Sequence, residues 1–233
     1  MKEPNCCGGN TPAFGKTAKS LMDQIGATVR GRLAEANLSQ SENETRKYIL
    51  REFARTGKPP AEKAIAEAMK LPSVESVRRF IERLNEADIL TVESGEIISA
   101  YPFSAKQTRH KVAFPDGHEI YSLCATDALG IHFMLGENVV VRSRCPECEG
   151  EMKIEVWEGK ISSCAPANVV EFVSSGDHCG CTAKTFCPFM NFFCSKEHLA
   201  KWREKNPASA QGEMYQLHQV LEHGKYIFGD FLK

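Results

Sequence analysis

Apolar residues recur at helical spacing through the N-terminal part of the chain. Over residues 16–36 they fall three or four positions apart, as at Leu21 and Ile25, which predicts an amphipathic helix. Two β runs, at 89–92 and 96–99, enclose a short glycine-containing turn and predict a hairpin. Between the first helix and the hairpin, the same helical spacing predicts three more helices, at 44–56, 61–69 and 73–86, the last capped by Ser73.

Three helices followed by a hairpin are typical of a winged-helix module, so residues 16–100 are predicted to form a helical, winged-helix-like domain. Many such modules bind DNA through the third helix, which would be 73–86 here. A DNA-reading helix normally carries a clear excess of basic residues. This helix instead balances its charges, with Arg78, Arg79 and Arg83 against Glu75, Glu82 and Glu86. The sequence therefore favours a structural role for the domain over DNA binding.

The pattern changes to strand-like segments after residue 100. Strands are predicted at 111–114, 119–123, 138–143, 152–157, 161–163 and 169–173. Helices are predicted at the C-terminal end, over 196–205 behind the N-cap Ser195 and around Met214, Leu217, Val220 and Leu221. We therefore predict an α+β fold, in which the winged-helix-like domain precedes a domain at 101–233 with a small, mostly antiparallel sheet flanked by helices. Residues 1–15, rich in Gly, Pro and Asn, are predicted to be a flexible tail.

The overall composition is ordinary for a globular protein and limits the partners and the cellular compartment to be expected. Hydrophobic residues make up 42% of the chain and the formal net charge is -1, so strong attraction to nucleic acid or to a membrane surface is not expected. No segment has the roughly 20 apolar residues that span a bilayer, and the N-terminus lacks the apolar core of a secretory signal. We therefore expect a cytoplasmic protein whose thiols stay reduced.

The chain has 10 cysteines, which is many for a cytoplasmic protein. Cysteines there bind metal or carry out chemistry more often than they form disulfides, although a cysteine can also be a small buried hydrophobe. Cys124 stands where the strand 119–123 meets a helical pattern over 125–135. A helix N-terminus lowers the pKa of a thiol, and Asp127 would share the face of Cys124. The plain alternative is a core cysteine and an acid that merely favours the first helical turn.

Cys187 lies among aromatic residues in the segment 186–193. Phe186, Phe189 and Met190 are predicted to line a dry substrate pocket that would accept a cation with an organic substituent, and the Met190 thioether is a weak soft ligand. The alternative is that these residues form ordinary core.

Four segments taken in order resemble the alkylmercury lyases, the organomercurial lyases of bacterial mercury resistance. They are Tyr101-Pro102-Phe103, Thr108-Arg109-His110, Cys124-Ala125-Thr126-Asp127-Ala128-Leu129-Gly130 and Cys187-Pro188-Phe189-Met190-Asn191-Phe192-Phe193. The resemblance covers most of the chain after residue 15 and implies an N-terminal winged-helix-like domain that does not read DNA. It also implies that Cys124, Asp127 and Cys187 are catalytic.

The resemblance implies protonolysis of a carbon–mercury bond in an organomercurial substrate, with release of a hydrocarbon. Two thiolates suit a soft metal, so Cys124 and Cys187 would hold the Hg(II) product. The leaving carbon needs a proton, which Asp127 would carry from a thiol. No cofactor is required. Low-molecular-weight thiols would extract Hg(II) and a mercuric reductase would accept it, while nucleic acid and membranes are not expected partners.

The remaining cysteines are not explained by the resemblance. Cys145 and Cys148 form a Cys-x-x-Cys motif, and Cys179 and Cys181 follow at a distance typical of zinc sites. These four are predicted as an auxiliary site for structural zinc or for mercury, with free thiols as the alternative. The pair Cys6–Cys7 could carry Hg(II) or belong to an inert tail. Cys194 is expected to be packed, and His110 to have a structural hydrogen-bonding role.

Two other classes of function compete with the lyase. One is a winged-helix, metal-sensing transcription regulator with a cysteine metal site, and the other is a thiol-rich metal buffer. The balanced charge of 73–86 counts against the regulator, and so does Asp127, because a pure thiolate sensor needs no proton carrier. The metal buffer stays open as an alternative.

Overall fold

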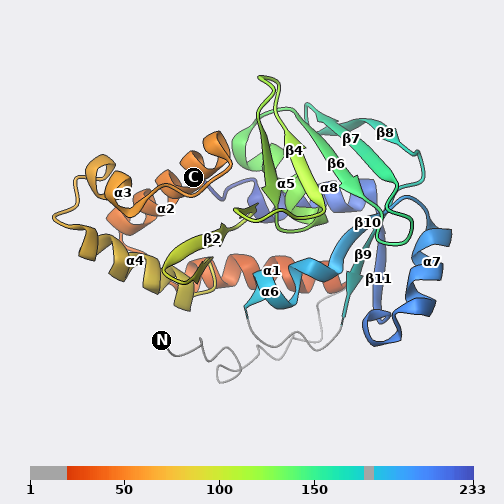
Figure 1. Ribbon diagram of the computed structural model, residues 1–233, viewed down its shortest axis with the longest axis horizontal. Coiled ribbons are helices and arrows are strands. Elements are labelled where there is room, and N and C mark those ends of the chain that lie inside the picture. Colours follow the sequence, from red (N-terminus) through yellow and green to blue (C-terminus); the bar gives the residue numbers. More distant parts are fainter. Residues whose placement is uncertain (1–19, 176–180) are drawn as a thin grey trace.

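The computed structural model describes residues 20–175 and 181–233. Figure 1 shows an α+β fold with helices at one end and sheet at the other. One sheet has eight strands in the order β1-β2-β3-β5-β4-β6-β7-β8, and a second has three in the order β10-β9-β11. Every strand pair described is antiparallel. The predicted mixed fold with mostly antiparallel sheet is therefore confirmed, with two sheets instead of one.

The N-terminal helices follow the predicted order, and serine side chains cap the starts of α1, α2 and α4. They are α1 (Leu21–Glu35), α2 (Gln40–Thr56), α3 (Glu62–Ala68) and α4 (Val74–Glu86). Ser73 caps α4 by accepting a hydrogen bond from the Ser76 backbone, as the sequence predicts. Helix α2 begins four residues earlier than the predicted start at 44, because Ser39 and Glu42 form a reciprocal capping box in the polar segment.

The hairpin β1 (Leu90–Glu93) and β2 (Glu96–Ala100) is present but is not a separate wing. Strand β2 pairs with β3 (Phe103–Ser104), so the hairpin continues directly into the eight-stranded sheet. The two predicted domains therefore share one sheet across residue 100, and the winged-helix likeness stays a prediction. The predicted tail at 1–15 lies outside the described residues.

The rest of the large sheet consists of β4 (His110–Ala113), β5 (Glu119–Ser122), β6 (Val139–Arg144), β7 (Glu151–Trp157) and β8 (Lys160–Ala165). The small sheet consists of β9 (Val170–Ser174), β10 (Met190–Phe193) and β11 (Gly212–Gln216). Met214 therefore lies in a strand and not in the helix predicted around it.

The remaining helical segments connect or cover these sheets. They are α5 (Ala125–Leu135), α6 (Thr182–Thr185), the 3-10 turn η1 (Cys187–Phe189), α7 (Lys196–Lys205), the 3-10 turn η2 (Pro207–Ser209) and α8 (Leu217–Phe228). Helix α5 has its predicted bounds, and Ser195 caps α7 as predicted. Figure 1 shows α5 and α8 behind the large sheet and α1 running beneath.

Helices α5 and α8 approach each other closely through two glycines. A Cβ added to Gly224 would lie 2.9 Å from the backbone Cα and N of Gly130, which no ordinary contact allows. Helix α5 is almost entirely buried, and it carries Cys124 and Asp127 at its start. The glycine contact therefore sets how closely α5, which carries the candidate site, packs against α8.

We expect Gly224→Ala to lower the free energy of unfolding by about 1–3 kcal/mol, because the added methyl forces two packed backbones apart. Urea denaturation with an unchanged m-value would measure this loss. Gly31 is a matched control, since it lies within α1 and an added Cβ there meets nothing within 4 Å. Gly31→Ala should leave stability equal or raise it by up to about 1 kcal/mol. Equal stability of the two variants would refute the close-contact argument.

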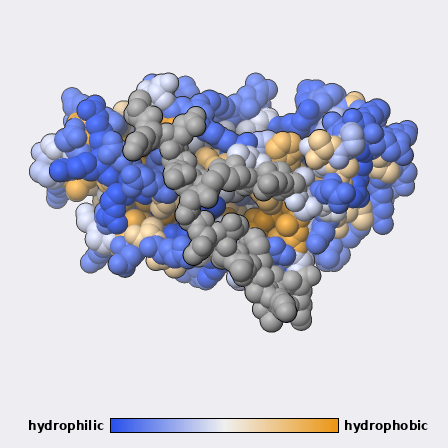
Figure 2. Space-filling view, turned by 90° about the horizontal axis from the view of Figure 1, so that it is seen from below, coloured by the Kyte–Doolittle hydropathy of each residue, from blue (hydrophilic) through white to orange (hydrophobic). Residues whose placement is uncertain are grey.

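The surface is mixed in polarity. On the face in Figure 2, hydrophilic residues dominate both ends and hydrophobic residues gather nearer the middle. No helix among the described residues is both long enough and apolar enough to cross a bilayer. Two of the three arginines of α4 are paired: Arg78 with Glu62 at 2.9 Å, and Arg83 with Glu42. Their charge is thus satisfied within the helical region.

Candidate active site

Cys124 occupies the predicted junction between strand β5 and helix α5. It is the N-cap of α5, with extended backbone angles, and its sulfur accepts a hydrogen bond from the Asp127 backbone N–H at 3.4 Å. A thiol thus takes the place of the usual hydroxyl or carboxylate cap. Asp127 follows in the first turn, on the same side of the helix as the capping sulfur.

Cys187 reaches the same place from a distant part of the chain. It lies in η1, directly before β10, and pairing of β10 with β9 holds this segment against the second sheet. The sulfurs of Cys124 and Cys187 and a carboxylate oxygen of Asp127 all lie within 4.8 Å of one another. All three residues are buried, with at most 5% of their surface exposed. One ion could therefore contact both sulfurs with the carboxyl group alongside.

Burial, and not the helix N-terminus, controls the protonation of the two thiols. Burial raises the pKa of Cys124 well above its usual value, and the neighbouring Cys187 and Asp127 raise it further. The hydrogen bond with Cys124 lowers the pKa of Cys187, but burial and the Asp127 charge outweigh it, so this pKa is raised too. The expectation of a lowered thiol pKa at Cys124 was wrong. Both groups rest as neutral thiols near pH 7.

The pKa of Asp127 also differs from that of an ordinary acid in the first turn of a helix. Burial raises the pKa of Asp127 to about 7, although hydrogen bonds from Cys124 act in the opposite direction. Its Oδ2 is buried and has no hydrogen-bond partner among the described residues. A carboxyl group that titrates near neutral pH and has an oxygen to spare can both accept and release a proton.

A second buried acid is hydrogen-bonded to the first turn of α5. Glu171, on β9, accepts a hydrogen bond from the Thr126 hydroxyl at 2.8 Å and is fully buried. Burial raises the pKa of Glu171 to about 8, so the group is mostly neutral near pH 7. Glu171 was not predicted as a site residue from the sequence. The only sequence signal is a lone acid inside an apolar β run.

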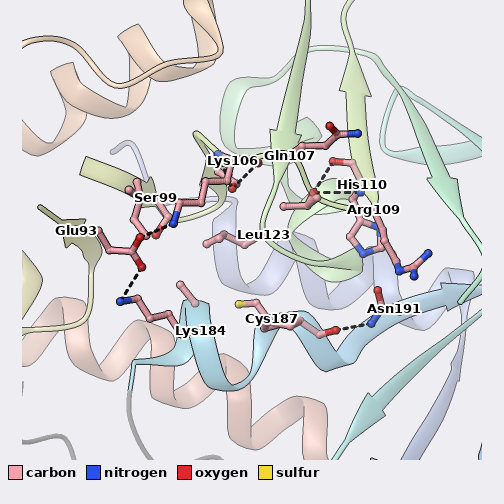
Figure 3. A pocket seen from close by; sticks show the side chains of 15 residues that line it. Glu93, Ser99, Lys106, Gln107, Arg109, His110, Leu123, Lys184, Cys187 and Asn191 are labelled. Atoms are coloured by element: carbon pink, nitrogen blue, oxygen red, sulfur yellow. Dashed lines mark hydrogen bonds and ion pairs between the residues drawn. The ribbon is translucent and has the colours of Figure 1, made fainter. Parts of the chain in front are cut away.

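A cavity of about 360 Å³ opens onto Cys187. Figure 3 shows the Cys187 sulfur pointing into it, opposite Leu123, and ion pairs joining Glu93 to Lys106 and Lys184 at one side. Cys124 and Asp127 are buried next to Cys187 but are not among the residues that line the cavity. A small molecule entering from this side would therefore meet Cys187 first.

Two family-like residues border the thiols. The hydroxyl of Tyr101 is buried beside Cys187, and burial raises its pKa well above the usual value. His110 is buried with its Nδ1 3.0 Å from the Ser143 hydroxyl, and burial lowers its pKa to about 4. His110 therefore stays neutral and is held by hydrogen bonds, in agreement with the structural role expected of it.

The predicted substrate pocket lies elsewhere than the cavity. Met190 is buried at the start of β10, Phe186 and Phe189 are half-buried, and none of the three lines the cavity at Cys187. The segment around Cys187 contributes Pro188 and Asn191 to that lining instead. For Met190 the reason is local: side chains alternate along β10, so Met190 is buried in the core while the next residue, Asn191, faces the cavity. A substrate role for Phe186, Phe189 and Met190 stays a prediction.

The structure keeps two of the four residues predicted for the auxiliary metal site and gives them different partners. Cys145 and Cys148 do meet, but their partners are Cys194 and His198, and the four ligand atoms lie within 4.8 Å of one another. Cys181 is not part of this group, because α6 places its sulfur 3.3 Å from the Thr91 hydroxyl. The other predicted members and tail cysteines, Cys179, Cys6 and Cys7, lie outside the described residues. The spacing Cys194-x-x-x-His198 is the signal that could have identified the true partners.

Comparison with known proteins gives one consistent result. The sequence model of the alkylmercury lyase family matches residues 103–229. The alkylmercury lyase of Staphylococcus epidermidis is 25% identical over 179 residues, covering 77% of this chain and 79% of that protein. The alkylmercury lyase of Bacillus cereus is 24% identical over 154 residues, covering 66% of this chain and 67% of that protein.

A solved structure has the same fold. The mercury-bound form of MerB2 superposes with a TM-score of 0.72 at 23% sequence identity, covering 90% of this chain and 98% of that one. The region matched by the family model extends over more than half of the chain and includes Cys124, Asp127 and Cys187. This chain is therefore an enzyme of the alkylmercury lyase family.

Proposed function

We propose that this enzyme cleaves the carbon–mercury bond by protonolysis, with Cys124 and Cys187 as metal ligands and Asp127 as proton carrier. The observation that carries the proposal is the convergence of two buried sulfurs and one buried carboxyl group within 4.8 Å. Family membership supports the reaction class, and the residue roles follow from the geometry. The substrate is an organomercurial, R–Hg–X.

The first step is ligand exchange at mercury. The substrate enters the cavity and meets Cys187 first, because Cys187 lines the cavity and Cys124 and Asp127 do not. The sulfur of Cys187 binds mercury and displaces X, and the thiol proton leaves with X as HX. Thiol sulfur competes well for mercury because both are soft. Mercury thereby reaches the end of the cavity beside the second thiol.

The second step delivers the proton. Asp127 takes the proton of the Cys124 thiol, whose raised pKa keeps it protonated until mercury approaches. The new thiolate binds mercury, which weakens the bond to carbon by adding electron density to the metal. Asp127 then protonates the carbon as it leaves, and R–H is formed. Overall, R–Hg–X and two thiols give R–H, HX and Hg(II) bound to two thiolates.

Release of Hg(II) completes the cycle. Two low-molecular-weight thiols exchange with the two protein thiolates and restore Cys124 and Cys187. We propose a mercuric reductase as the protein that receives the metal. The reaction as written needs no further cofactor.

Two features favour the lyase over a metal-sensing regulator. Arg78 and Arg83 of α4 form ion pairs with glutamates, so these charges are balanced and α4 lacks the basic excess of a DNA-reading helix. The buried Asp127 also has a use in proton transfer that a thiolate sensor does not require.

Hydrocarbon release tests the proposed function directly. The full-length enzyme is incubated with phenylmercury and excess reduced glutathione, and benzene is measured by gas chromatography. We expect several benzene molecules per chain, because thiol exchange frees the site after each turnover. Mercury binding without benzene release would contradict the lyase and leave the metal sensor or buffer as the better interpretation.

A further inference from the structure

A second thiol cluster lies away from the catalytic residues, where two connections meet. Cys145 and Cys148 lie in the turn between β6 and β7. Cys194 directly follows β10, and His198 lies in the first turn of α7. The Sγ atoms of the three cysteines and one ring nitrogen of His198 lie within 4.8 Å of one another. The four groups thus come from two segments that are distant in sequence.

The β6–β7 turn is folded as a tight loop around its sulfurs. The Cys145 backbone N–H donates to the Gly150 carbonyl at 3.0 Å, and the Glu149 N–H donates to the Cys145 carbonyl at 2.9 Å. Glu149 takes a left-handed conformation with φ 54, and the Gly150 N–H donates to the Cys148 sulfur at 3.4 Å. Hydrogen bonds of this kind hold both sulfurs on one side of the loop.

The opposite segment is equally fixed. Ser195 caps α7 and accepts a hydrogen bond from the His198 backbone N–H at 3.3 Å. This cap sets the helix so that His198 lies one turn after Cys194, with its Nδ1 2.8 Å from the Cys194 sulfur. The imidazole therefore faces the thiols.

Two of the three ligand–ligand distances match the edges of a tetrahedral zinc site. Zn–S bonds of about 2.3 Å and Zn–N bonds of about 2.0 Å imply roughly 3.8 Å between two sulfurs and about 3.6 Å between sulfur and nitrogen. The Cys148 and Cys194 sulfurs are 3.7 Å apart, and the Cys145 sulfur is 3.8 Å from His198 Nδ1. The Cys194–His198 contact is shorter than the tetrahedral edge, so the His198 ring would have to move away from the Cys194 sulfur on binding the ion.

We propose that Cys145, Cys148, Cys194 and His198 bind one structural Zn(II) ion. Three cysteines and one histidine are a standard set for a closed zinc site, and the spacings Cys-x-x-Cys and Cys-x-x-x-His are the usual ones. Four protein ligands leave no open position for a substrate. Among the described residues, no carboxylate belongs to the group, so it lacks the proton carrier that the catalytic site has.

The ion would join the large sheet to the segment that carries Cys187. Its first two ligands follow β6 of the eight-stranded sheet, and its last two follow β10, which begins three residues after Cys187. An ion pair between Lys205 of α7 and Glu147 of the β6–β7 turn links the same two regions. The proposed role is therefore to clamp α7 and the end of β10 onto the β6–β7 hairpin.

Metal content tests the site. The enzyme, prepared without chelators, is analysed by mass spectrometry of the metals, and we expect about one zinc per chain. Cys148→Ser should lose the zinc. Cys164→Ser is the matched control, because Cys164 lies on β8 outside the cluster and its thiol donates a hydrogen bond to the Pro166 carbonyl. This variant should keep the zinc. Cys187→Ala, which removes a catalytic sulfur, should also keep it.

Cobalt substitution gives a second readout that does not require Cys148→Ser to fold. Co(II) added to metal-free Cys187→Ala should give the intense visible bands of tetrahedral thiolate coordination, and zinc should bleach them. A chelator should also lower the melting temperature of the untreated enzyme. Absence of zinc together with absence of these bands overturns the proposal, as does zinc that is lost in Cys187→Ala but kept in Cys148→Ser. Binding of mercury but neither zinc nor cobalt at the cluster also overturns it.

Discussion

Cys187→Ala should abolish benzene release from phenylmercury, with a loss of roughly 10⁴-fold or more in turnover, as for other covalent-catalysis residues. Cys187 lines the cavity and is the first sulfur that an entering substrate meets. Without it, mercury has a single protein sulfur, and the carbon–mercury bond is not weakened enough to break. Cys124→Ala should have an equally large effect, because it removes both the second ligand and the proton that Asp127 delivers.

The two variants are compared with Cys164→Ala, which removes a half-buried thiol outside both clusters and should retain full activity. Single-turnover experiments with enzyme in excess separate cleavage from product release. Each catalytic variant should also lose the two-sulfur binding of Hg(II), measured by competition with glutathione. Normal cleavage by Cys124→Ala would remove that residue from the chemistry and require another nucleophile.

Local signals predicted the elements with strong caps and clear periodicity. Ser73 and Ser195 mark the starts of α4 and α7, and α5 has its predicted bounds, because each of these signals acts within one or two turns. The short strands β10 and β11 were not predicted. Their residues pair with β9 from far along the chain, so sequence-local periodicity does not reveal them.

In the candidate site, too, the features set by neighbouring residues could be predicted, and those set by distant parts of the chain could not. The strand-to-helix position of Cys124 and the shared face of Asp127 follow from the pattern of residues 119–135. The approach of Cys187 follows only from resemblance to the family, because no spacing relates residues 63 positions apart. The thiol pKa was misjudged since the helix N-terminus is visible in sequence but the depth of burial is not.

The second cluster was half predicted for a related reason. The Cys-x-x-Cys of Cys145 and Cys148 is a local motif, whereas its completion depends on how β6–β7 meets the β10–α7 connection. Cys181 was chosen as a partner because it stands at a typical separation along the chain. The fold instead brings Cys194 and His198 to the site and leaves Cys181 beside Thr91.

Asp127→Asn should lower the rate of carbon protonation by roughly 10²–10⁴-fold, the usual contribution of a general acid–base group. Asparagine has the same shape but cannot accept the thiol proton. Both sulfurs remain, so the variant should still bind Hg(II) with the stoichiometry of the original enzyme. The matched control is Asp116→Asn, the same substitution in the exposed turn between β4 and β5, which leaves the two sulfurs and Asp127 untouched and should keep the original rate. Single-turnover benzene release at pH 7.5 (about half a unit above the Asp127 pKa) measures the difference.

The pH profile distinguishes a proton carrier from a residue that only positions the thiols. The pKa of Asp127 is raised to about 7 by burial, so at lower pH the carboxyl group is protonated and cannot take the thiol proton. The single-turnover rate of the original enzyme should therefore rise with pH through about 7 and then level off. Since the side-chain amide of the Asp127→Asn variant does not titrate, its residual rate should not show this rise. A variant that keeps the same rise, or the original rate at pH 7.5, would assign the proton transfer to another group; Glu171, a buried acid with a pKa of about 8 that accepts a hydrogen bond from Thr126, would be a candidate.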